Sequence, residues 1–368
     1  MPRPLRHFAL DLAPLLVLAG AGVTLLRDTA PPKAKARWHE RGRGREATSP
    51  RQIPARGWKD ILLRTKTEFQ EDQIPMIAAG VTFYTLLAFF PALGAFVALY
   101  GLFADAAEAQ KHLQLLAFML PPDALKFIGE QMVRLAAGNE GGLSFAFVSG
   151  LLLSIWSANG AMKAMMTGLN IAYDETEKRK FVRKTATSLA FTVSFLLFVL
   201  VACGVLAAGP AIETFVGREA VTLFRWISYP LLLVGMAGGL AALYRYGPSR
   251  DRAQWRWISW GSVVALLAWI AACAAFSIYV GNFAHYDKTY GPLGAVIGFM
   301  MWSWLSTVVI LFGAELNAEI EHQTAVDTTT GAPKPLGFRG AKMADTVGAA
   351  QDKARKPSGR PPKMSKAA

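Results

Sequence analysis

Six long apolar blocks dominate the chain, at residues 76–103, 143–172, 185–209, 222–244, 257–281 and 291–314. A helix needs about 20 mostly apolar residues to cross the hydrocarbon core of a bilayer, and each block reaches that length. Strands of this length are not expected, and the blocks lack the alternating pattern of a membrane barrel. The pattern predicts an all-α, polytopic helical membrane protein with a six-helix core.

Positive charge alternates between the segments that connect these blocks. Lys and Arg number 12 in residues 27–75, 5 in 173–184, 4 in 245–256 and 9 after residue 314, against 3 in 104–142, 2 in 210–225 and 1 in 282–290. Short basic loops stay on the cytoplasmic side of a membrane. We therefore expect the four basic segments, including the C-terminus, in the cytoplasm.

A shorter apolar block at residues 8–26 precedes the others. It follows Arg3 and Arg6 and contains small residues, as in a signal peptide. Cleavage there would place the basic segment 27–75 outside and invert every later span, against the charge count. We therefore expect residues 1–26 to hold an uncleaved extra span. A helix at the membrane surface is the alternative, because Asp11 and Pro14 interrupt the block.

The remaining segments are polar. Residues 27–56 are predicted to form a disordered or loosely packed basic linker, and residues 323–368 a disordered basic cytoplasmic tail. Between them lies a membrane domain of residues 57–322, which opens at residues 57–74 with an amphipathic helix at the interface. Its predicted apolar face holds Trp58, Ile61, Leu62 and Phe69, opposite Lys59, Lys66 and Asp60. The connection 104–142 is expected to cover the outer mouth of the bundle, with the docking of a partner as the alternative.

The net charge of +13 is typical of nucleic-acid binders, but 30 of the 39 basic residues lie in the four predicted cytoplasmic segments. A basic rim against anionic lipid headgroups explains that charge, so membrane lipids and not nucleic acid are the expected partners. The two cysteines, Cys203 and Cys273, both lie in apolar blocks, which excludes a disulfide scaffold.

Ionisable groups inside the blocks are few, and each costs about 2.5–3.5 kcal/mol on insertion scales. Asn159, Lys163, Asn170 and Asp174 share one face of the second core helix, and this polar stripe deepens from the cytoplasmic end. Lys163 lies about 16 Å from Asp174 along the helix axis, so snorkelling alone strains its reach to water.

The last core helix carries Glu315 and Glu319 one turn apart, with Asn317 beside them. We expect the second and last core helices to pack together, with Lys163 facing Glu315 or the Asn317 amide across a polar cavity or pathway. The alternative is interfacial snorkelling combined with hydrogen bonds that only hold the helices together.

Pro91 lies in the middle of the first core block and predicts a kink, because proline removes a backbone hydrogen bond and clashes with the preceding turn. A helix broken at a substrate site is the more specific alternative. The sequence has no HExxH, no phosphate-binding GxxxxGK[ST] and no cysteine-rich metal spacing. We therefore expect no catalytic residue, no metal and no cofactor.

Five groups of residues carry a resemblance to a known family. They are Ala79-Gly80-Val81-Thr82-Phe83-Tyr84 with Phe90-Pro91, Ala158-Asn159-Gly160 through Asn170-Ile171-Ala172-Tyr173-Asp174, Tyr244-Arg245-Tyr246-Gly247-Pro248, Tyr290-Gly291-Pro292-Leu293-Gly294-Ala295 and Gly313-Ala314-Glu315-Leu316-Asn317-Ala318-Glu319. In this order they resemble the YihY / virulence factor BrkB family of bacterial inner-membrane proteins over about residues 57–322. The resemblance implies a six-helix core in the inner membrane. Some members of that family have carried a ribonuclease label, and others are linked to virulence.

The function expected from these features is transport, flipping or export of an envelope-related substrate. A non-transporting scaffold that docks an envelope protein is the alternative, and an intramembrane enzyme comes third. A ribonuclease is not expected, because the chain lacks a soluble domain and clustered carboxylates or histidines for metal-assisted hydrolysis. The substrate and any homo-oligomer stay open at this point.

Overall fold

The computed structural model describes residues 42–103, 140–282 and 293–351. Within these ranges the chain forms helices and loops, with no strand beyond an isolated bridge between Ala253 and Thr329. The predicted extra span at 8–26 and nearly all of the connection 104–142 lie outside the described residues.

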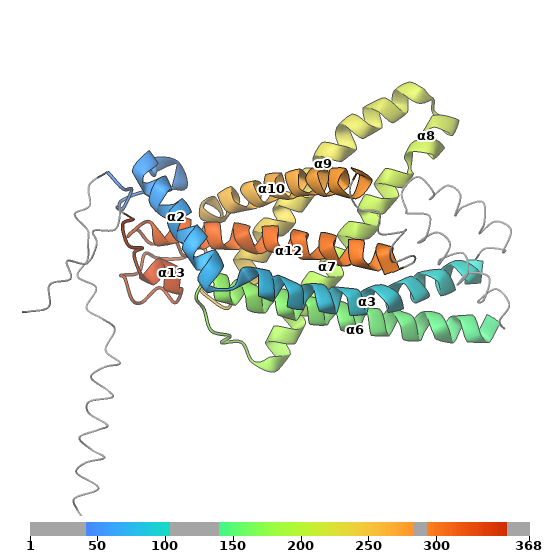
Figure 1. Ribbon diagram of the computed structural model, residues 1–368, viewed down its shortest axis with the longest axis horizontal. Helices are drawn as coiled ribbons and strands as arrows, with labels where there is room; N and C mark the ends of the chain where they lie inside the picture. The colour runs from blue at the N-terminus through green and yellow to red at the C-terminus, as the bar shows by residue number, and fades with distance from the viewer. Residues whose placement is uncertain (1–41, 104–139, 283–292, 352–368) are drawn as a thin grey trace, which may run out of the picture. The chain divides into compact units, whose positions relative to one another are not determined.

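Five helices of the described ranges are long and apolar enough to cross a membrane. They are Ile74–Ala92 within α3 (Ile74–Phe103), Phe181–Val205 within α7 (Phe181–Ala207), α9 (Arg218–Tyr246), Trp255–Val280 within α10 (Trp255–Asn282) and Val296–His322 within α12 (Leu293–His322). They confirm the predicted all-α polytopic membrane protein. The remaining block, 143–172, forms the 33-residue helix α6 (Glu140–Ala172), which lies alongside α3 (Figure 1).

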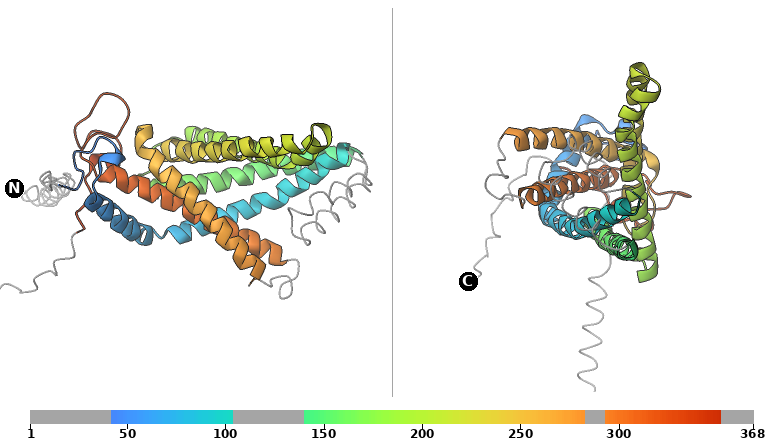
Figure 2. Two further views of the ribbon diagram at one scale, coloured as in Figure 1. Left: turned by 90° about the horizontal axis from the view of Figure 1, so that it is seen from above. Right: turned by 90° about the vertical axis from the view of Figure 1, so that its right-hand side faces the viewer.

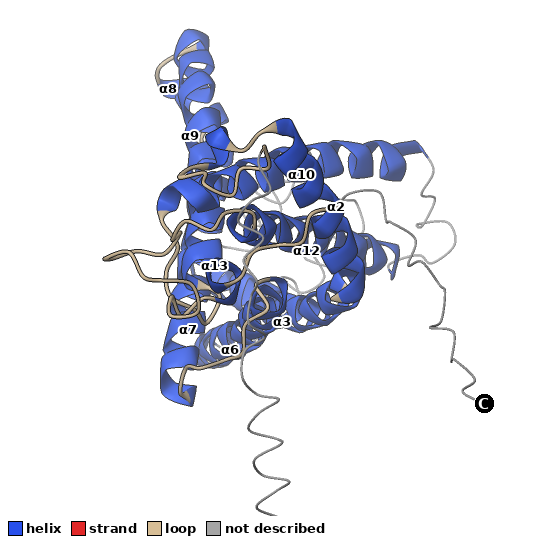
Figure 3. Cartoon of the chain, turned by 90° about the vertical axis from the view of Figure 1, so that its left-hand side faces the viewer, coloured by secondary structure: helices blue, strands red, loops and turns tan. Residues whose placement is uncertain are grey.

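The helix α12 lies at the centre of the bundle. It contacts α10, α3, α6 and α2 (Ala55–Glu71), and Figure 3 shows it between α10 and α3. The predicted contact between the second and last core helices is thus confirmed. Polar residues of α12 that face these neighbours are consequently removed from lipid and water.

The helices α7 and α9 lie along one flank, connected through the short α8 (Gly209–Phe215), and run obliquely to α10 and α12 (Figure 2). Their outer faces carry large exposed apolar side chains, such as Leu200 (69% exposed) and Trp226 (76%). Bilayer-facing side chains are expected to be apolar, and a helix satisfies its own backbone groups in lipid. These exposed faces therefore fit lipid contact.

Polar segments gather at one end of the bundle, which we call the polar end: residues 42–73, 173–180, 247–254 and 315–351 (Figure 1). The predicted disorder is wrong for residues 323–351 and for residues 42–56. Thr324, Thr328 and Ala344 are fully buried, and the backbone N–H of Ala325 donates to the carbonyl of Arg45 at 2.8 Å. Composition suggested disorder because these segments are poor in apolar residues, but hydrogen bonds and ion pairs hold them to the helix ends.

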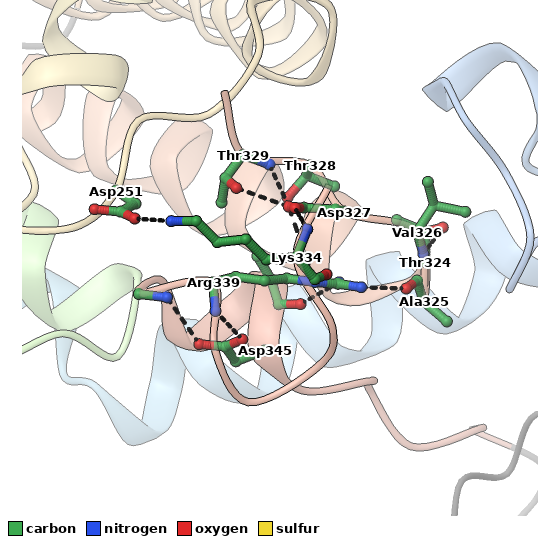
Figure 4. A network of polar contacts seen from close by, with 12 residues as sticks. Asp251, Thr324, Ala325, Val326, Asp327, Thr328, Thr329, Lys334, Arg339 and Asp345 are labelled. Carbon is green, nitrogen blue, oxygen red and sulfur yellow. Dashed lines mark hydrogen bonds and ion pairs between the residues drawn. The ribbon is translucent and has the colours of Figure 1, made fainter. Parts of the chain in front are cut away.

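The segment 323–351 has its own polar core (Figure 4). The Asp345 carboxylate accepts hydrogen bonds from the backbone N–H groups of Gly337, Arg339 and Gly340 at 2.8–3.1 Å. The Arg339 guanidinium donates to the carbonyls of Ala325 and Ala344. This folded segment ends with the four-residue helix α13 (Lys342–Asp345) and a loop to residue 351.

Asp327, beside Arg339, holds the start of the segment 323–351 in place. Burial raises the pKa of Asp327, but the backbone N–H groups of Lys334 and Thr329 and the Arg339 charge outweigh it and hold the pKa below its ordinary value. Asp327 is therefore ionised at neutral pH, and its charge contributes to folding of this segment.

The amphipathic helix expected at residues 57–74 is α2. Its buried face differs from the sequence prediction, because Asp60 is buried (1% exposed) whereas Leu62 is 54% exposed. Arg43 compensates the Asp60 charge with an ion pair of 2.6 Å. The linker residues before α2 thus decide which face of the helix is buried.

Pro91 lies inside α3, which continues as a helix to Phe103. The proline therefore does not end the helix. The predicted kink and a helix broken at a substrate site both stay predictions.

Candidate functional site

Four buried polar residues near the end of α12 occupy opposite faces of that helix. Glu315 and Glu319 are one turn apart and face α2, whereas Asn317 and Glu321 are displaced by about half a turn. None of the four is more than 1% exposed, because neighbouring helices and the folded segment 323–351 cover the polar end. Each group therefore needs a partner from the protein.

Arg64 of α2 is the partner of Glu319. Its Nε donates to the Glu319 carboxylate, Nη2 donates to Gln323 Oε1 at 2.8 Å, and Nη1 donates to the carbonyl of Ala349 at 3.0 Å. The two charged side chains are 5% and 1% exposed. This arginine joins α2, the end of α12 and the C-terminal segment in one contact.

Arg250, in the α9–α10 turn, is the partner of Glu321. Its Nη2 donates to Glu321 Oε1 at 2.6 Å, with both side chains fully buried. The guanidinium lies over the Tyr173 ring, 4.4 Å from the centroid. Burial lowers the pKa of Arg250, but the Glu321 charge outweighs it, so the pKa is raised and the pair is ionised.

Glu315 has no cationic partner in the described part of the chain. Acids dominate its surroundings, namely Asp72, Glu319 and Glu68. Its Oε1 is buried and has no hydrogen-bond partner among the described residues. Burial raises the pKa of Asp72, the half-buried C-cap residue of α2.

Asn317 and Asn159 supply further incompletely satisfied polar groups. Asn317 Oδ1 accepts from the backbone N–H of Gly261 at 2.9 Å, while its Nδ2 finds no acceptor in the described part of the chain. Asn159 of α6 is 5% exposed, and none of the described residues donates to its Oδ1. Buried polar groups in native proteins are usually paired, so these two amides are notable inside a membrane domain.

The other residues of the predicted stripe, in α6 and just after it, have different partners. The Lys163 ammonium lies 5.4 Å from the ring centroid of Phe181. Asn170 Oδ1 accepts from the backbone N–H of Ser249 at 2.7 Å. Asp174, in a left-handed conformation (φ 56°), forms an ion pair with Lys342. The seven predicted residues are thus divided among several contacts.

The predicted contact between Lys163 and Glu315 is wrong. Lys163 lies against Phe181 at the start of α7, and Glu315 faces Asp72 at the end of α2. The physical reason is that α6 lies chiefly along α3, whereas the acidic face of α12 is directed to α2. The position of α2 at the polar end could not be read from the apolar blocks.

The α6–α7 and α9–α10 turns are fixed to each other. Glu177 forms a 2.7 Å ion pair with Arg179, which also donates to the carbonyl of Gly247 at 2.7 Å. Burial raises the pKa of Glu177, but the hydrogen bonds and charge of Arg179 lower it to about 2. This contact fixes the turn that follows α9.

Comparison with known proteins places the chain in a family. The virulence factor BrkB family matches residues 65–336, and the chain belongs to this family. The ribonuclease-like protein YfkH of Bacillus subtilis is 33% identical over 54% of this chain and 73% of that protein. A UPF0761 membrane protein of Rhodospirillum centenum is 27% identical over 71% of this chain, and the match spans 57% of its length.

A UPF0761 membrane protein of Alteromonas mediterranea is 24% identical over 68% of this chain and 84% of its own. No solved structure matches the chain. Among the described residues, no group of three or more His, Cys, Asp or Glu side chains is arranged to hold a metal ion.

Proposed function

We propose that this BrkB-family membrane protein moves an envelope-related substrate across the bacterial inner membrane, by transport, flipping or export, without acting as an enzyme. We further propose that its polar end faces the cytoplasm. The alternation of Lys and Arg counts supports that orientation, since the polar end holds the basic connections. The scaffold alternative would dock an envelope protein through the basic cytoplasmic rim or through the connection 104–142, nearly all of which lies outside the described residues.

The observation that supports the transport proposal is a set of buried polar groups on α12 and α6 that lack hydrogen-bond partners. Within the described residues, Glu315 Oε1, Asn317 Nδ2 and Asn159 Oδ1 are buried and have no hydrogen-bond partner, in a domain that must stay stable in lipid. Leaving such a group unpaired costs about 1–3 kcal/mol. A bundle selected only for stability would replace these side chains by apolar ones. A substrate, or a second arrangement of the helices, would satisfy them during transport.

Replacing Asn159 by leucine tests this proposal. Leucine is similar in size and removes an amide oxygen that has no partner, so we expect stability to be kept or increased. If the amide acts on a substrate, Asn159→Leu fails to restore the lipid and metabolite profile of a deletion strain that the unmodified gene restores. Thr307→Val is the matched control, because the Thr307 hydroxyl already bonds to the Ser303 carbonyl of its own helix.

Two outcomes of these experiments distinguish transport from a scaffold function. Full restoration by Asn159→Leu would contradict a role of that amide in transport. A deletion strain with an unchanged profile, but with an altered set of envelope proteins bound to the chain, would favour the scaffold.

Accessible cysteines test the proposed orientation. In a chain with Cys203 and Cys273 replaced by alanine, Lys180→Cys places a thiol at the polar end and Arg218→Cys places one at the start of α9. Both positions are exposed. A membrane-impermeant maleimide added to intact cells that are permeable only at the outer membrane should label position 218 and spare position 180. Labelling of position 180 alone would show the opposite orientation, with the polar end on the outer side of the membrane.

A further inference from the structure

Arg245, in the last turn of α9, is a buried cation that lacks an acidic partner among the described residues. It is 9% exposed, and its Nε and Nη1 have no hydrogen-bond partner in the described part of the chain. Three other enclosed arginines of the polar end each pair with an acid, in the contacts Arg64–Glu319, Arg250–Glu321 and Arg339–Asp327. A buried charge without a counter-ion is costly. Arg245 therefore needs an anion that the described residues do not supply.

Two aromatic rings hold the Arg245 guanidinium in place. Its Cζ lies 4.4 Å from the ring centroid of Trp255, the first residue of α10, and 5.4 Å from that of Tyr246. The two rings are in edge-to-face contact, with their centroids 6.2 Å apart. Stacking on a ring attracts the cation but leaves its in-plane N–H groups available for an oxyanion. Because Nε and Nη1 are enclosed by the protein, Nη2 is the nitrogen that a ligand can reach.

Positive charge is in excess around this group. The exposed Arg252 lies over the same Tyr246 ring, with its Cζ 5.1 Å from the centroid. Arg256, exposed in the first turn of α10, donates from Nε to the Gln254 side-chain oxygen at 2.8 Å. The acids of the adjoining turns are already paired, in the contacts Glu177–Arg179 and Asp251–Lys334. Three arginines beside acids that are committed elsewhere favour an oxyanion such as a phosphate group.

The position of the site favours the phosphate of a lipid over a free phosphate ion. The site lies where α9 ends and α10 begins, and both helices are candidate membrane spans, so it lies at headgroup depth. The face of α9 that carries Arg245 continues along the span with Val234, Leu231 and Ile227, which are 60–68% exposed. Gly238 lies on the same face, and a Cβ there would meet no atom within 4 Å. An acyl chain can therefore lie along this face while its phosphate reaches Arg245.

We propose that Arg245, together with Arg252, Arg256 and the rings of Tyr246 and Trp255, binds the phosphate of an anionic phospholipid in the leaflet at the polar end. The excess of positive charge selects a lipid whose headgroup has no ammonium of its own. The bound phosphate compensates the Arg245 charge, and the acyl chain covers the exposed face of α9. The site needs no transported substrate, so it stands apart from the function proposed above.

Native mass spectrometry of the purified full chain in detergent, titrated with dioleoylphosphatidylglycerol, measures this binding. We expect one lipid to bind more tightly than any further ones. Arg245→Met should weaken that binding by about tenfold or more, the value of one charge-assisted hydrogen bond. The exposed Arg252 contributes less, so Arg252→Gln should weaken it by a smaller factor. Arg183→Met, which removes an exposed arginine at the start of α7, should leave it unchanged.

Thermal unfolding of the same variants, followed by circular dichroism, separates lipid binding from packing. Methionine fills much of the arginine volume and removes an unpartnered charge, so Arg245→Met should unfold no earlier than the unmodified chain without lipid. It should lose the rise in melting temperature that phosphatidylglycerol gives the unmodified chain. If Arg245→Met fails to fold, Trp255→Leu replaces a ring that is 51% exposed and should reduce both the lipid affinity and that rise.

Four results would overturn the proposal. Equal phosphatidylglycerol affinity in the unmodified and Arg245→Met chains would show that this arginine does not bind the lipid. Lower stability of Arg245→Met without lipid, with the lipid-induced rise kept, would show a packing role only. An equal rise from dioleoylphosphatidylcholine would exclude selection of an anionic headgroup. An equal rise from inorganic phosphate alone would show a site for the free ion. None of these results bears on whether a substrate is transported.

Discussion

Replacing Arg250 by methionine is expected to reduce the free energy of unfolding by about 3–5 kcal/mol, because it leaves Glu321 as a buried charge without its cation. Both side chains of this pair are fully buried, so water cannot replace the lost partner. The Tyr173 ring also loses the guanidinium stacked 4.4 Å from its centroid. Chemical unfolding of the purified chain in detergent micelles, followed by circular dichroism, measures the loss.

An exposed ion pair of the same polar end provides the matched control. Lys334 and Asp251 are 2.9 Å apart, but their side chains are 41% and 52% exposed. Surface pairs contribute about 0–1 kcal/mol, so Lys334→Met should change stability little. The double variant Arg250→Met with Glu321→Gln should lose less than Arg250→Met alone. Equal losses in the single and double variants would show that Glu321 is not the group left uncompensated.

The spans were predictable from the sequence because length and apolar content decide them locally. Each core block needs only to satisfy its own backbone in lipid, and no distant residue changes that requirement. The same local argument predicted α2 as an amphipathic helix. That argument wrongly placed Asp60 on the exposed face, because the burial of this acid depends on Arg43, which precedes the helix in the linker.

The polar end could not be predicted, because its contacts join residues far apart in the chain. Arg64 meets Glu319, and Arg45 donates to the carbonyl of Gly348. Neither contact leaves a periodic signal in the sequence. Glu315 and Glu319 could be recognised, since buried acids in a spanning helix are rare. Their partners could not, and Lys163 was a reasonable but wrong choice.

Replacing Gly261 by alanine is expected to lower stability by about 1–3 kcal/mol, the typical cost of forcing extra atoms into a packed interior. A Cβ at this position of α10 would overlap the side-chain amide of Asn317 on α12. It would also disturb the 2.9 Å hydrogen bond from the Gly261 N–H to Asn317 Oδ1. The better helix propensity of alanine, worth about 1 kcal/mol, offsets only part of this loss.

Two further variants show whether the α10–α12 contact causes that loss. Gly298→Ala, on α12 itself, is the control: a Cβ there meets no atom within 4 Å, so we expect no destabilisation. Asn317→Ala removes the amide that obstructs the new methyl group, so Gly261→Ala should be less harmful in the Asn317→Ala background. If Gly261→Ala costs the same with and without Asn317, the close approach of the two helices does not depend on this amide. Coupling between the two positions would show that the contact between Gly261 and Asn317 holds α12 in a fixed rotation, with Glu319 directed to Arg64 of α2.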